Sequence, residues 1–313
     1  MFWFYIVLAT LAVLVFLVLL ISYICFRMAF LARPDPCAGQ EYPIPPGEVY
    51  KPHRAVMQEW MQATRQIPCQ EFSVTSFDGL KLYGKYYECQ PGAPIELMFH
   101  GYRGLAERDL CGGVQRCFRL GRNALLVDQR SAGKSEGKVI SFGINERRDC
   151  ATWVDFMVRH FGPDVKIILT GISMGAATVM MASELPLPKN VIGIIADCGY
   201  SSNREIITRV IRQMKLPAFS YFFVKLGARI YGGFDLEEAS PIEAMKHCRL
   251  PVFFAHGEAD DFVPCQMSLD NFAACPAPKR LLTVPEAGHG LGYIYAGEKY
   301  LEVLRDIEKE YAL

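Results

Sequence analysis

Six short apolar runs alternate with longer amphipathic segments along most of the chain, and this alternation limits the possible folds more than any other feature. The runs are apolar at nearly every position, which is typical of parallel strands that helices cover on both faces. The alternation therefore predicts an α/β fold with a doubly wound, mostly parallel sheet. The runs are IELMFH, NALLVD, VKIILT, VIGIIAD, PVFFAHG and RLLTVPEAGH.

Two further features complete the predicted α/β domain, which we place at 70–313. The segment 71–89, EFSVTSFDGLKLYGKYYEC, alternates on either side of Asp78-Gly79 and predicts an antiparallel hairpin. An insertion at about 199–250 separates two of the apolar runs, and ordinary connections have only roughly 2 to 6 residues. Its two stretches of helical spacing are compatible with a crossover helix packed on the sheet and with a small helical cap over a site.

The N-terminal segment predicts a membrane anchor, because the first 26 residues contain no charged side chain. As a helix, residues 2–26 would extend roughly 37 Å at about 1.5 Å per residue, which is enough to cross a bilayer with some tilt. A cleaved signal peptide is one alternative, but it would have a basic start, a shorter apolar stretch and a small-x-small cleavage site. A buried core helix is the other. We predict a transmembrane anchor at 1–28, followed at 29–69 by a linker and a short amphipathic helix near 53–65.

Charge and cysteine content indicate the partners and the compartment. The 33 basic and 33 acidic residues cancel, so no global field favours a nucleic-acid partner. Lys and Arg residues follow the apolar span and none precedes it, which favours a single-pass protein with a cytoplasmic C-terminal domain. The eleven cysteines are odd in number and form no C-x-x-C pair, which predicts reduced, mostly buried thiols and no zinc site.

Residues that could carry chemistry stand just after the apolar runs, where the carboxyl ends of parallel strands gather ligands and catalytic groups. Ser173 lies within a G-x-S-x-G motif, an acidic loop follows a later run, and His289 follows the last one. Serine, acid and histidine in this order favour a nucleophile over an ordinary turn serine. The segments are HGYRG (100–104), DQRSAGKSEG (128–137), TGISMG (170–175), HGEADDFVP (256–264) and AGHG (287–290).

On these motifs the chain from about residue 71 onward resembles the α/β-hydrolase superfamily, and it looks most like the lysophospholipase-like and serine-aminopeptidase-like branch. The resemblance implies that Ser173 is the nucleophile and His289 the general base. It also implies that the backbone N–H groups of Tyr102 and Met174 form the oxyanion hole. We expect no cofactor and no metal ion.

The acid of such a triad is less directly specified, because the acidic loop offers Glu258, Asp260 and Asp261. The resembling families place it four residues after the histidine of an H-G-x-x-D pattern, which selects Asp260. A carboxylate in this role accepts the N–H of the catalytic histidine and stabilises the imidazolium.

The segment DQRSAGKSEG is compatible with two other motifs, but both fail in detail. A phosphate-binding P-loop requires glycine where Asp128 stands. The S-x-x-K pair of Ser131 and Lys134 lacks the S-D-N and K-T-G elements of penicillin-binding enzymes. The resemblance implies a structural turn beside the active site.

Together these features predict a serine hydrolase that cleaves small-molecule esters or thioesters through an acyl-enzyme. The apolar anchor and the apolar insertion favour acyl or lipid-like substrates. A peptidase on the same fold and a non-enzymatic, membrane-tethered interaction module are the alternatives.

Overall fold

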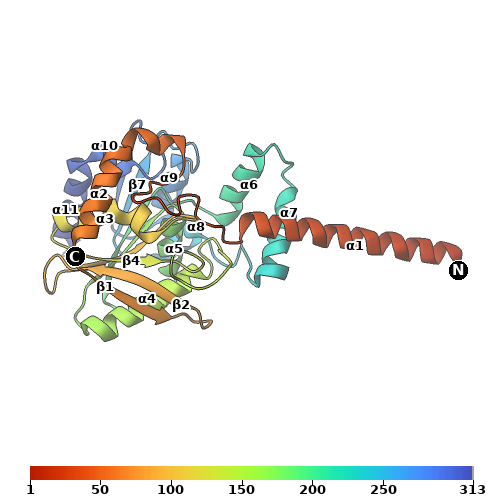
Figure 1. The fold of residues 1–313 in the computed structure, drawn as a ribbon, viewed down its shortest axis with the longest axis horizontal. Helices are drawn as coiled ribbons and strands as arrows, with labels where there is room; N and C mark the ends of the chain where they lie inside the picture. Colours follow the sequence, from red (N-terminus) through yellow and green to blue (C-terminus); the bar gives the residue numbers. More distant parts are fainter. Residues whose placement is uncertain (312–313) are drawn as a thin grey trace.

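An eight-stranded sheet forms the centre of the computed structural model, which describes residues 1–311 (Figure 1). The strands are β1 (Cys69–Thr75), β2 (Lys81–Tyr87), β3 (Ile95–Phe99), β4 (Asn123–Asp128), β5 (Ile167–Ile172), β6 (Val191–Asp197), β7 (Val252–Gly257) and β8 (Lys279–Val284). Their order in the sheet is β1-β2-β4-β3-β5-β6-β7-β8. Strand β2 is antiparallel to β1 and β4, whereas the strands from β4 to β8 pair in parallel. The predicted mostly parallel sheet with an N-terminal antiparallel hairpin is confirmed.

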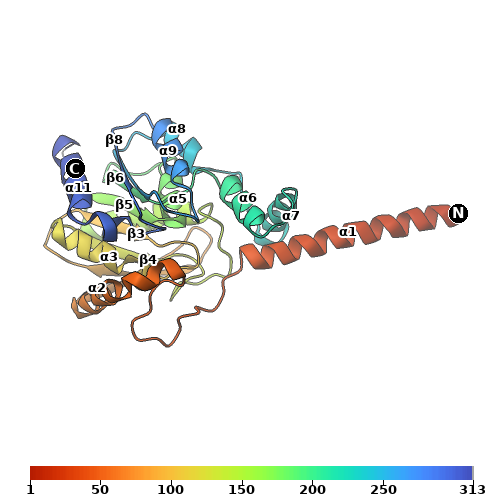
Figure 2. The same ribbon diagram turned by 90° about the horizontal axis from the view of Figure 1, so that it is seen from above.

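Helices cover both faces of this sheet (Figure 2). They are α1 (Phe2–Ala29), α2 (Arg54–Gln66), α3 (Ala106–Arg119), α4 (Glu146–Phe161), α5 (Met174–Ala182), α6 (Asn203–Gln213), α7 (Ser220–Gly227), α8 (Pro241–His247), α9 (Cys265–Ala274), α10 (Gly292–Ala296) and α11 (Glu298–Tyr311), with a 3-10 helix η1 (Glu48–His53) and a π-helical turn η2 (Ala228–Gly232). Helices α4, α5, α8 and α9 pack on one face, and α3, α10 and α11 pack on the other. This double cover explains why β3 and β7 are buried along their whole length.

A buried carboxylate lies at the centre of the sheet. Glu96 of β3 has no exposed surface, and its carboxylate accepts hydrogen bonds from Arg116, from Arg122 at 2.5 Å and from Thr170 at 2.9 Å. These partners belong to α3, to the residue before β4 and to β5, so the network joins a helix to both neighbouring strands. Burial alone would raise the pKa of Glu96, but the two guanidinium groups outweigh burial and hold it at about 2.

Helix α1 projects from the domain (Figure 1), and most of its side chains are exposed. It is the one helix within residues 1–311 whose length and apolar composition would allow it to cross a membrane. Its last turns are different, because Phe26 and Phe30 are buried in a cluster with side chains of α6, α7 and η2. The domain therefore includes the C-terminal end of the apolar helix in its own packing.

The insertion between β6 and β7 contains three α-helices and the π-helical turn η2, whereas the sequence showed only two stretches of helical spacing. Helices α6 and α7 correspond to the two stretches of helical spacing, and we call them, with η2, the cap. No residue of the cap, which lies within residues 1–311, lines the cavity that is described below beside Ser173, so a cap over the site stays a prediction. The third helix, α8, packs Met245 into the main core and serves as the crossover helix. With seven residues it is too short to show helical periodicity. Its available signal was Ser240 followed by Pro241, since the serine caps the helix and proline is favoured at the first helical position.

Replacing Glu96 with Gln would leave the buried Arg116 guanidinium without a counter-charge, while Arg122 would keep its ion pair with Glu308. We therefore expect the free energy of unfolding to fall by about 3 kcal/mol at neutral pH. Chemical denaturation of the full chain in detergent measures this. The folded-state pKa of Glu96 lies below the ordinary 4.5. The contribution of its carboxylate to the free energy of unfolding is therefore complete above about pH 4.5 and is lost as the pH falls towards 2. The stabilities of wild type and Glu96→Gln should therefore converge on acidification.

Glu298→Gln provides the matched control. Glu298 pairs with Arg119 and Arg305, but its side chain is half exposed, and exposed ion pairs contribute little to stability. We expect little or no change in unfolding for this variant. Equal losses for the two variants would contradict a special role for the buried network.

Candidate active site

Ser173 lies at the sharp turn where β5 passes into α5, with φ 56° and ψ −118°. A positive φ is unfavourable for a residue with a side chain, so the turn is strained. The neighbouring glycines allow it. A Cβ atom on Gly171 would lie 2.2 Å from the backbone of Gly175, and one on Gly175 would lie 2.0 Å from the carbonyl oxygen of Phe99. This strand-turn-helix geometry is the one that the predicted nucleophile elbow requires.

His289 and Asp260 are in direct contact. Nδ1 of His289 lies 2.6 Å from Oδ2 of Asp260, and Oδ1 accepts the backbone N–H groups of Phe262 and Val263 at 3.0 and 2.9 Å. Burial alone would raise the pKa of Asp260, but hydrogen bonds from His256 and His289 hold it well below its ordinary value. An ionised carboxylate at Nδ1 keeps a proton on that nitrogen and leaves Nε2 of His289 free to accept one.

The structure distinguishes the three acids of the loop after β7. Asp260 is buried and contacts His289, whereas Glu258 and Asp261 are exposed. The backbone carbonyl of Asp261 accepts a hydrogen bond from Arg209 of α6 at 2.6 Å, which ties the loop to the cap. The geometry therefore favours Asp260 as the partner of the histidine.

A second histidine, His256, lies near the same carboxylate but is fully buried. Its Nε2 is 3.2 Å from Oδ2 of Asp260 and 2.9 Å from the Val263 carbonyl oxygen, and its Nδ1 is 2.6 Å from Oγ of Ser268. Both ring nitrogens are thus occupied by the protein. His256 holds the acidic loop in place and does not meet a substrate.

The loop after β3 passes directly beside Ser173, since a Cβ atom on Gly101 would lie 3.5 Å from Cβ of Ser173. Tyr102 is the next residue of this loop, and Met174 is the first residue of α5. Both line the same cavity as Ser173. Backbone N–H groups at a helix N-terminus have no partner within the helix and attract negative charge.

This cavity has a volume of about 950 Å³, and Ser173 and His289 both lie in its wall. Its size is in the range of small-molecule sites, roughly 300 to 1,000 Å³. Within residues 1–311 the Ser173 hydroxyl forms no hydrogen bond to the His289 ring. Such bonds are often long in ligand-free enzymes and shorten when substrate binds.

The segment between α1 and α2 forms one wall of the cavity, which the sequence did not indicate. Its prolines and glycines suggested only a linker. Instead, Asp35 forms an ion pair with Arg108 of α3 at 2.7 Å, and a Cβ atom on Gly288 would lie 2.5 Å from a methyl group of Val49. These contacts join residues far apart in the sequence, so no local signal could have found them.

The end of α1 is hydrogen-bonded to the loop that carries Tyr102. The Tyr102 hydroxyl donates to the Ala29 carbonyl oxygen at 2.6 Å. The Arg103 guanidinium donates to the carbonyl oxygens of Met28 at 2.7 Å and Leu31 at 3.1 Å. These bonds satisfy carbonyl groups that a helix leaves without partners at its C-terminus. The apolar helix therefore helps to position a loop beside Ser173.

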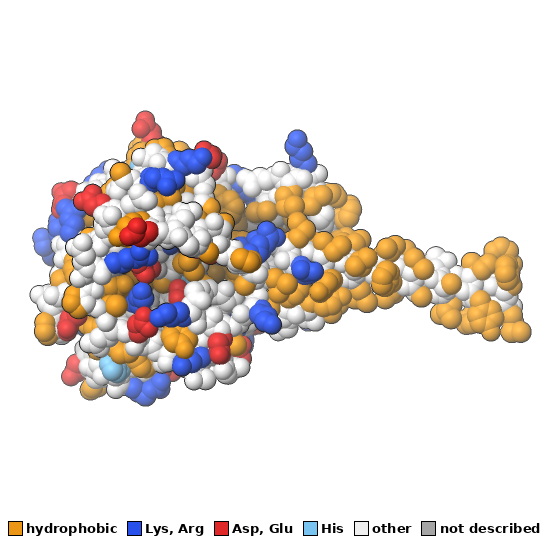
Figure 3. Space-filling view, in the orientation of Figure 1, with side chains coloured by type: hydrophobic (Ala, Val, Ile, Leu, Met, Phe, Trp, Pro, Cys, Tyr) orange, Lys and Arg blue, Asp and Glu red, His pale blue; other side chains and the backbone are white. Residues whose placement is uncertain are grey.

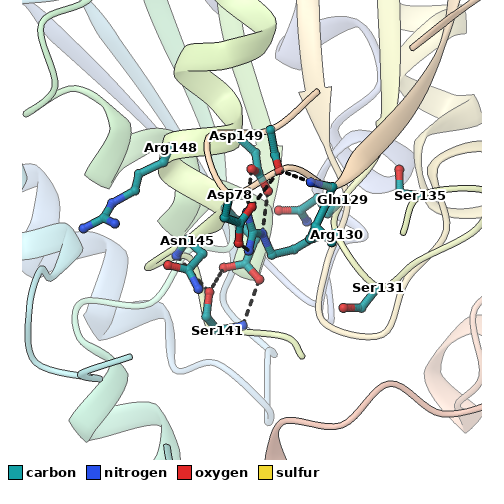
Figure 4. A network of polar contacts seen from close by, with 12 residues as sticks. Asp78, Gln129, Arg130, Ser131, Ser135, Ser141, Asn145, Arg148 and Asp149 are labelled. Atoms are coloured by element: carbon teal, nitrogen blue, oxygen red, sulfur yellow. Dashed lines mark hydrogen bonds and ion pairs between the residues drawn. The ribbon is translucent and has the colours of Figure 1, made fainter. Parts of the chain in front are cut away.

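The segment 128–137 forms a structural turn. Figure 4 shows the Arg130 guanidinium between Asp78 and Asp149, to which it donates hydrogen bonds of 2.6 to 3.1 Å. The Asp128 carboxylate accepts the backbone N–H of Lys134 at 3.0 Å. These side chains bond to the protein itself, which fits a scaffold role and not a phosphate cradle.

One group of potential metal ligands occurs within the described part of the chain, namely Cys198, Asp260 and His289, whose ligand atoms lie within 4.8 Å of one another. Burial raises the pKa of the Cys198 thiol well above its ordinary value, which disfavours the thiolate that a metal requires. Nδ1 of His289 is already bound to Asp260. This donor set fits a hydrogen-bonded acid and base better than a metal centre.

No family model matches the chain, and the sequence comparison finds distant relatives. The uncharacterised protein YqkD of Bacillus subtilis is 26% identical over 193 residues, which make up 60% of this chain and 62% of that protein. The match thus spans less than two thirds of the relative's length.

Solved structures are similar over far more of the chain. The Pyrococcus furiosus esterase Pf2001 superposes with a TM-score of 0.65 at 20% identity, over 90% of this chain and 98% of that one. The α/β hydrolase GrgF of Penicillium sp. sh18 superposes with a TM-score of 0.62 at 16% identity, over 79% of this chain and all of that one (100%). Together with the order of the strands in the sheet, these similarities show that the chain has an α/β-hydrolase fold.

Proposed function

We propose that the protein is a serine hydrolase that cleaves carboxylic esters or thioesters of acyl or lipid-like molecules. The 2.6 Å contact between His289 and Asp260, at the cavity that Ser173 also lines, carries this proposal. It provides an oriented base at the edge of the sheet where a strained turn presents a hydroxyl group. The similarity to a protein described as an esterase supports hydrolysis as the reaction class.

In the proposed mechanism, Nε2 of His289 takes the hydroxyl proton as Oγ of Ser173 attacks the carbonyl carbon. Asp260 stabilises the resulting imidazolium, because its low pKa keeps it ionised. The backbone N–H groups of Tyr102 and Met174 bind the oxyanion. The imidazolium then protonates the departing alcohol or thiol, and a water molecule activated by the same base releases the acid from the serine.

The wall of the cavity supports an acyl substrate. Apolar side chains from several elements line it, next to charged residues of which several are paired within the protein, as Arg108 is with Asp35 and Asp109. Apolar surface combined with placed polar groups is typical of sites that bind small organic molecules. The apolar lining residues include Met57, Trp60, Ile140, Ile172 and Ile294.

We further propose that α1 anchors the domain to a membrane as a single span. The packing of Phe26 and Phe30 into the domain, and the bond from the Tyr102 hydroxyl to Ala29, support a retained helix, because removal of a signal peptide would destroy these contacts. Arg27 and later basic residues follow the span, which favours a cytoplasmic domain.

A fluorophosphonate probe, which bonds covalently to activated serine hydroxyls, should label the full chain in detergent. In Ser173→Ala, labelling and ester hydrolysis should both fall to background, because the nucleophile is absent. Mass spectrometry of the labelled peptide identifies the modified residue. Ser131→Ala is the matched control, since Ser131 lines the same cavity but donates its hydroxyl hydrogen bond to the Val139 carbonyl at 3.0 Å.

Labelling that persists in Ser173→Ala would contradict this nucleophile. Faster hydrolysis of aminoacyl amides than of short-chain esters would favour a peptidase. Absence of labelling in the folded wild type would favour a non-enzymatic module.

Asp260→Asn keeps the size of the side chain but removes its charge, so we expect kcat to fall by about 10³- to 10⁴-fold with little change in KM. The physical reason is that the imidazolium loses its counter-charge and the histidine its correct tautomer. Hydrolysis of a short-chain nitrophenyl ester measures the effect. Asp261→Asn, a neighbouring exposed carboxylate, should leave kcat unchanged, and equal losses in the two variants would refute the choice of acid.

A further inference from the structure

The outer surface of the α6–α7 cap carries a group of exposed apolar side chains, each with 46 to 69% of its surface exposed. We call this group the cap patch, and it consists of Met214, Leu216, Phe219, Phe222 and Ile230. Figure 3 shows apolar side chains continuing from α1 onto the adjoining part of the domain. Large contiguous apolar surfaces of this kind mark interaction sites.

The cap is packed against the part of α1 that lies nearest the domain. The Tyr231 hydroxyl donates to the Leu19 carbonyl oxygen at 3.1 Å, and its ring centre lies 5.1 Å from that of Tyr23. A Cβ atom on Gly227 would lie 2.4 Å from the carbonyl oxygen of Ser22, so α7 and α1 approach backbone to backbone. The cap is therefore held at the level of residues 19–23 of the apolar helix.

This level corresponds to the edge of a bilayer. A helix needs about 20 residues to cross a hydrocarbon core of about 30 Å. A span that begins near Trp3 therefore ends near Tyr23, just before Arg27, the first charged side chain of the chain. The ring pair of Tyr23 and Tyr231 fits this position, because tyrosine is enriched where a membrane meets water.

The charges around the cap patch also fit a lipid surface. Residues 209–233 include five Lys or Arg residues and no Asp or Glu, and Arg212, Lys215 and Arg229 are exposed. Acidic side chains lie on the side of the patch where Glu237 pairs with Lys225. An apolar face bordered by basic side chains is typical of segments that lie in the interface of membranes containing anionic lipids.

We propose that the α6–α7 cap is a second membrane contact, which inserts shallowly into the leaflet where α1 ends and has the lipid bilayer as its partner. This proposal rests on the proposed membrane anchor and not on ester hydrolysis. Because the cap is packed against the end of α1, the two contacts together fix the orientation of the domain on the membrane. The cavity wall includes Ala32 and Arg33, directly after α1, so the insertion brings the cavity to the lipid surface and lets an acyl substrate reach it from the bilayer.

Quenching of tryptophan fluorescence by brominated lipids tests the insertion. The full chain and the variants Phe219→Trp and Phe222→Trp are reconstituted in phosphatidylcholine and phosphatidylglycerol vesicles whose acyl chains carry bromine close to the headgroups. We expect the emission that each new tryptophan adds to be largely quenched. Tyr295→Trp is the control, because Tyr295 on α10 is 44% exposed and lies outside the cap; its added emission should not be quenched.

The native Trp3 reports on the anchor. Its emission is the difference between wild type and Trp3→Phe, and we expect vesicle lipids that carry bromine deeper in their acyl chains to quench it. Quenching of Trp3 without quenching of either new tryptophan would overturn the cap contact while leaving the anchor. Absence of quenching at all three positions would overturn both. The measurement does not involve hydrolysis, so its failure is distinct from failure of the proposed activity.

Discussion

The parallel pairing of β3, β5, β6, β7 and β8 brings the carboxyl ends of these strands to one edge of the sheet, and the candidate site depends on this pairing. Ser173 follows β5, Asp260 follows β7 and His289 follows β8. The register of the strands brings the last two side chains to 2.6 Å from each other, although 29 positions separate them in the chain. The glycines on either side of Ser173 then allow the backbone to turn where a bulkier residue would collide with β3 or α5.

Charged groups stabilise this arrangement from within. The Glu96 network lies between the central strands and α3, where removing the carboxylate would leave the Arg116 guanidinium buried without a counter-charge. At the edge of the sheet, Asp260 is held by two backbone N–H groups as well as by two histidines. An acid restrained in this way keeps the His289 ring in one orientation, which a general base requires.

The apolar helix α1 belongs to the same packed unit. Phe30 is fully buried, and the Tyr102 and Arg103 side chains bond to carbonyl groups at the end of the helix. A change in the position of α1 would therefore be transmitted to the loop beside Ser173. In the proposed enzyme, attachment to a membrane and the geometry of the oxyanion-binding loop are physically linked, and the cap lies against the same helix.

Local sequence patterns determined the fold of this protein: runs that are apolar at nearly every position form the six parallel strands, Asp78-Gly79 forms the turn of the hairpin, and the uncharged N-terminal run forms the long helix. The order of motifs also singled out Ser173, an acidic loop and His289, because the chemistry of a triad constrains which residue types follow successive strands. Local patterns left three acids open, and only the resemblance pointed to Asp260, which lies against the histidine in the structure. Tertiary structure alone decided that parts of the segment 32–50 line the cavity and that α1 bonds to the loop after β3. The physical reason is that periodicity and turn chemistry act between neighbours in the chain, whereas these contacts form only when distant segments pack together.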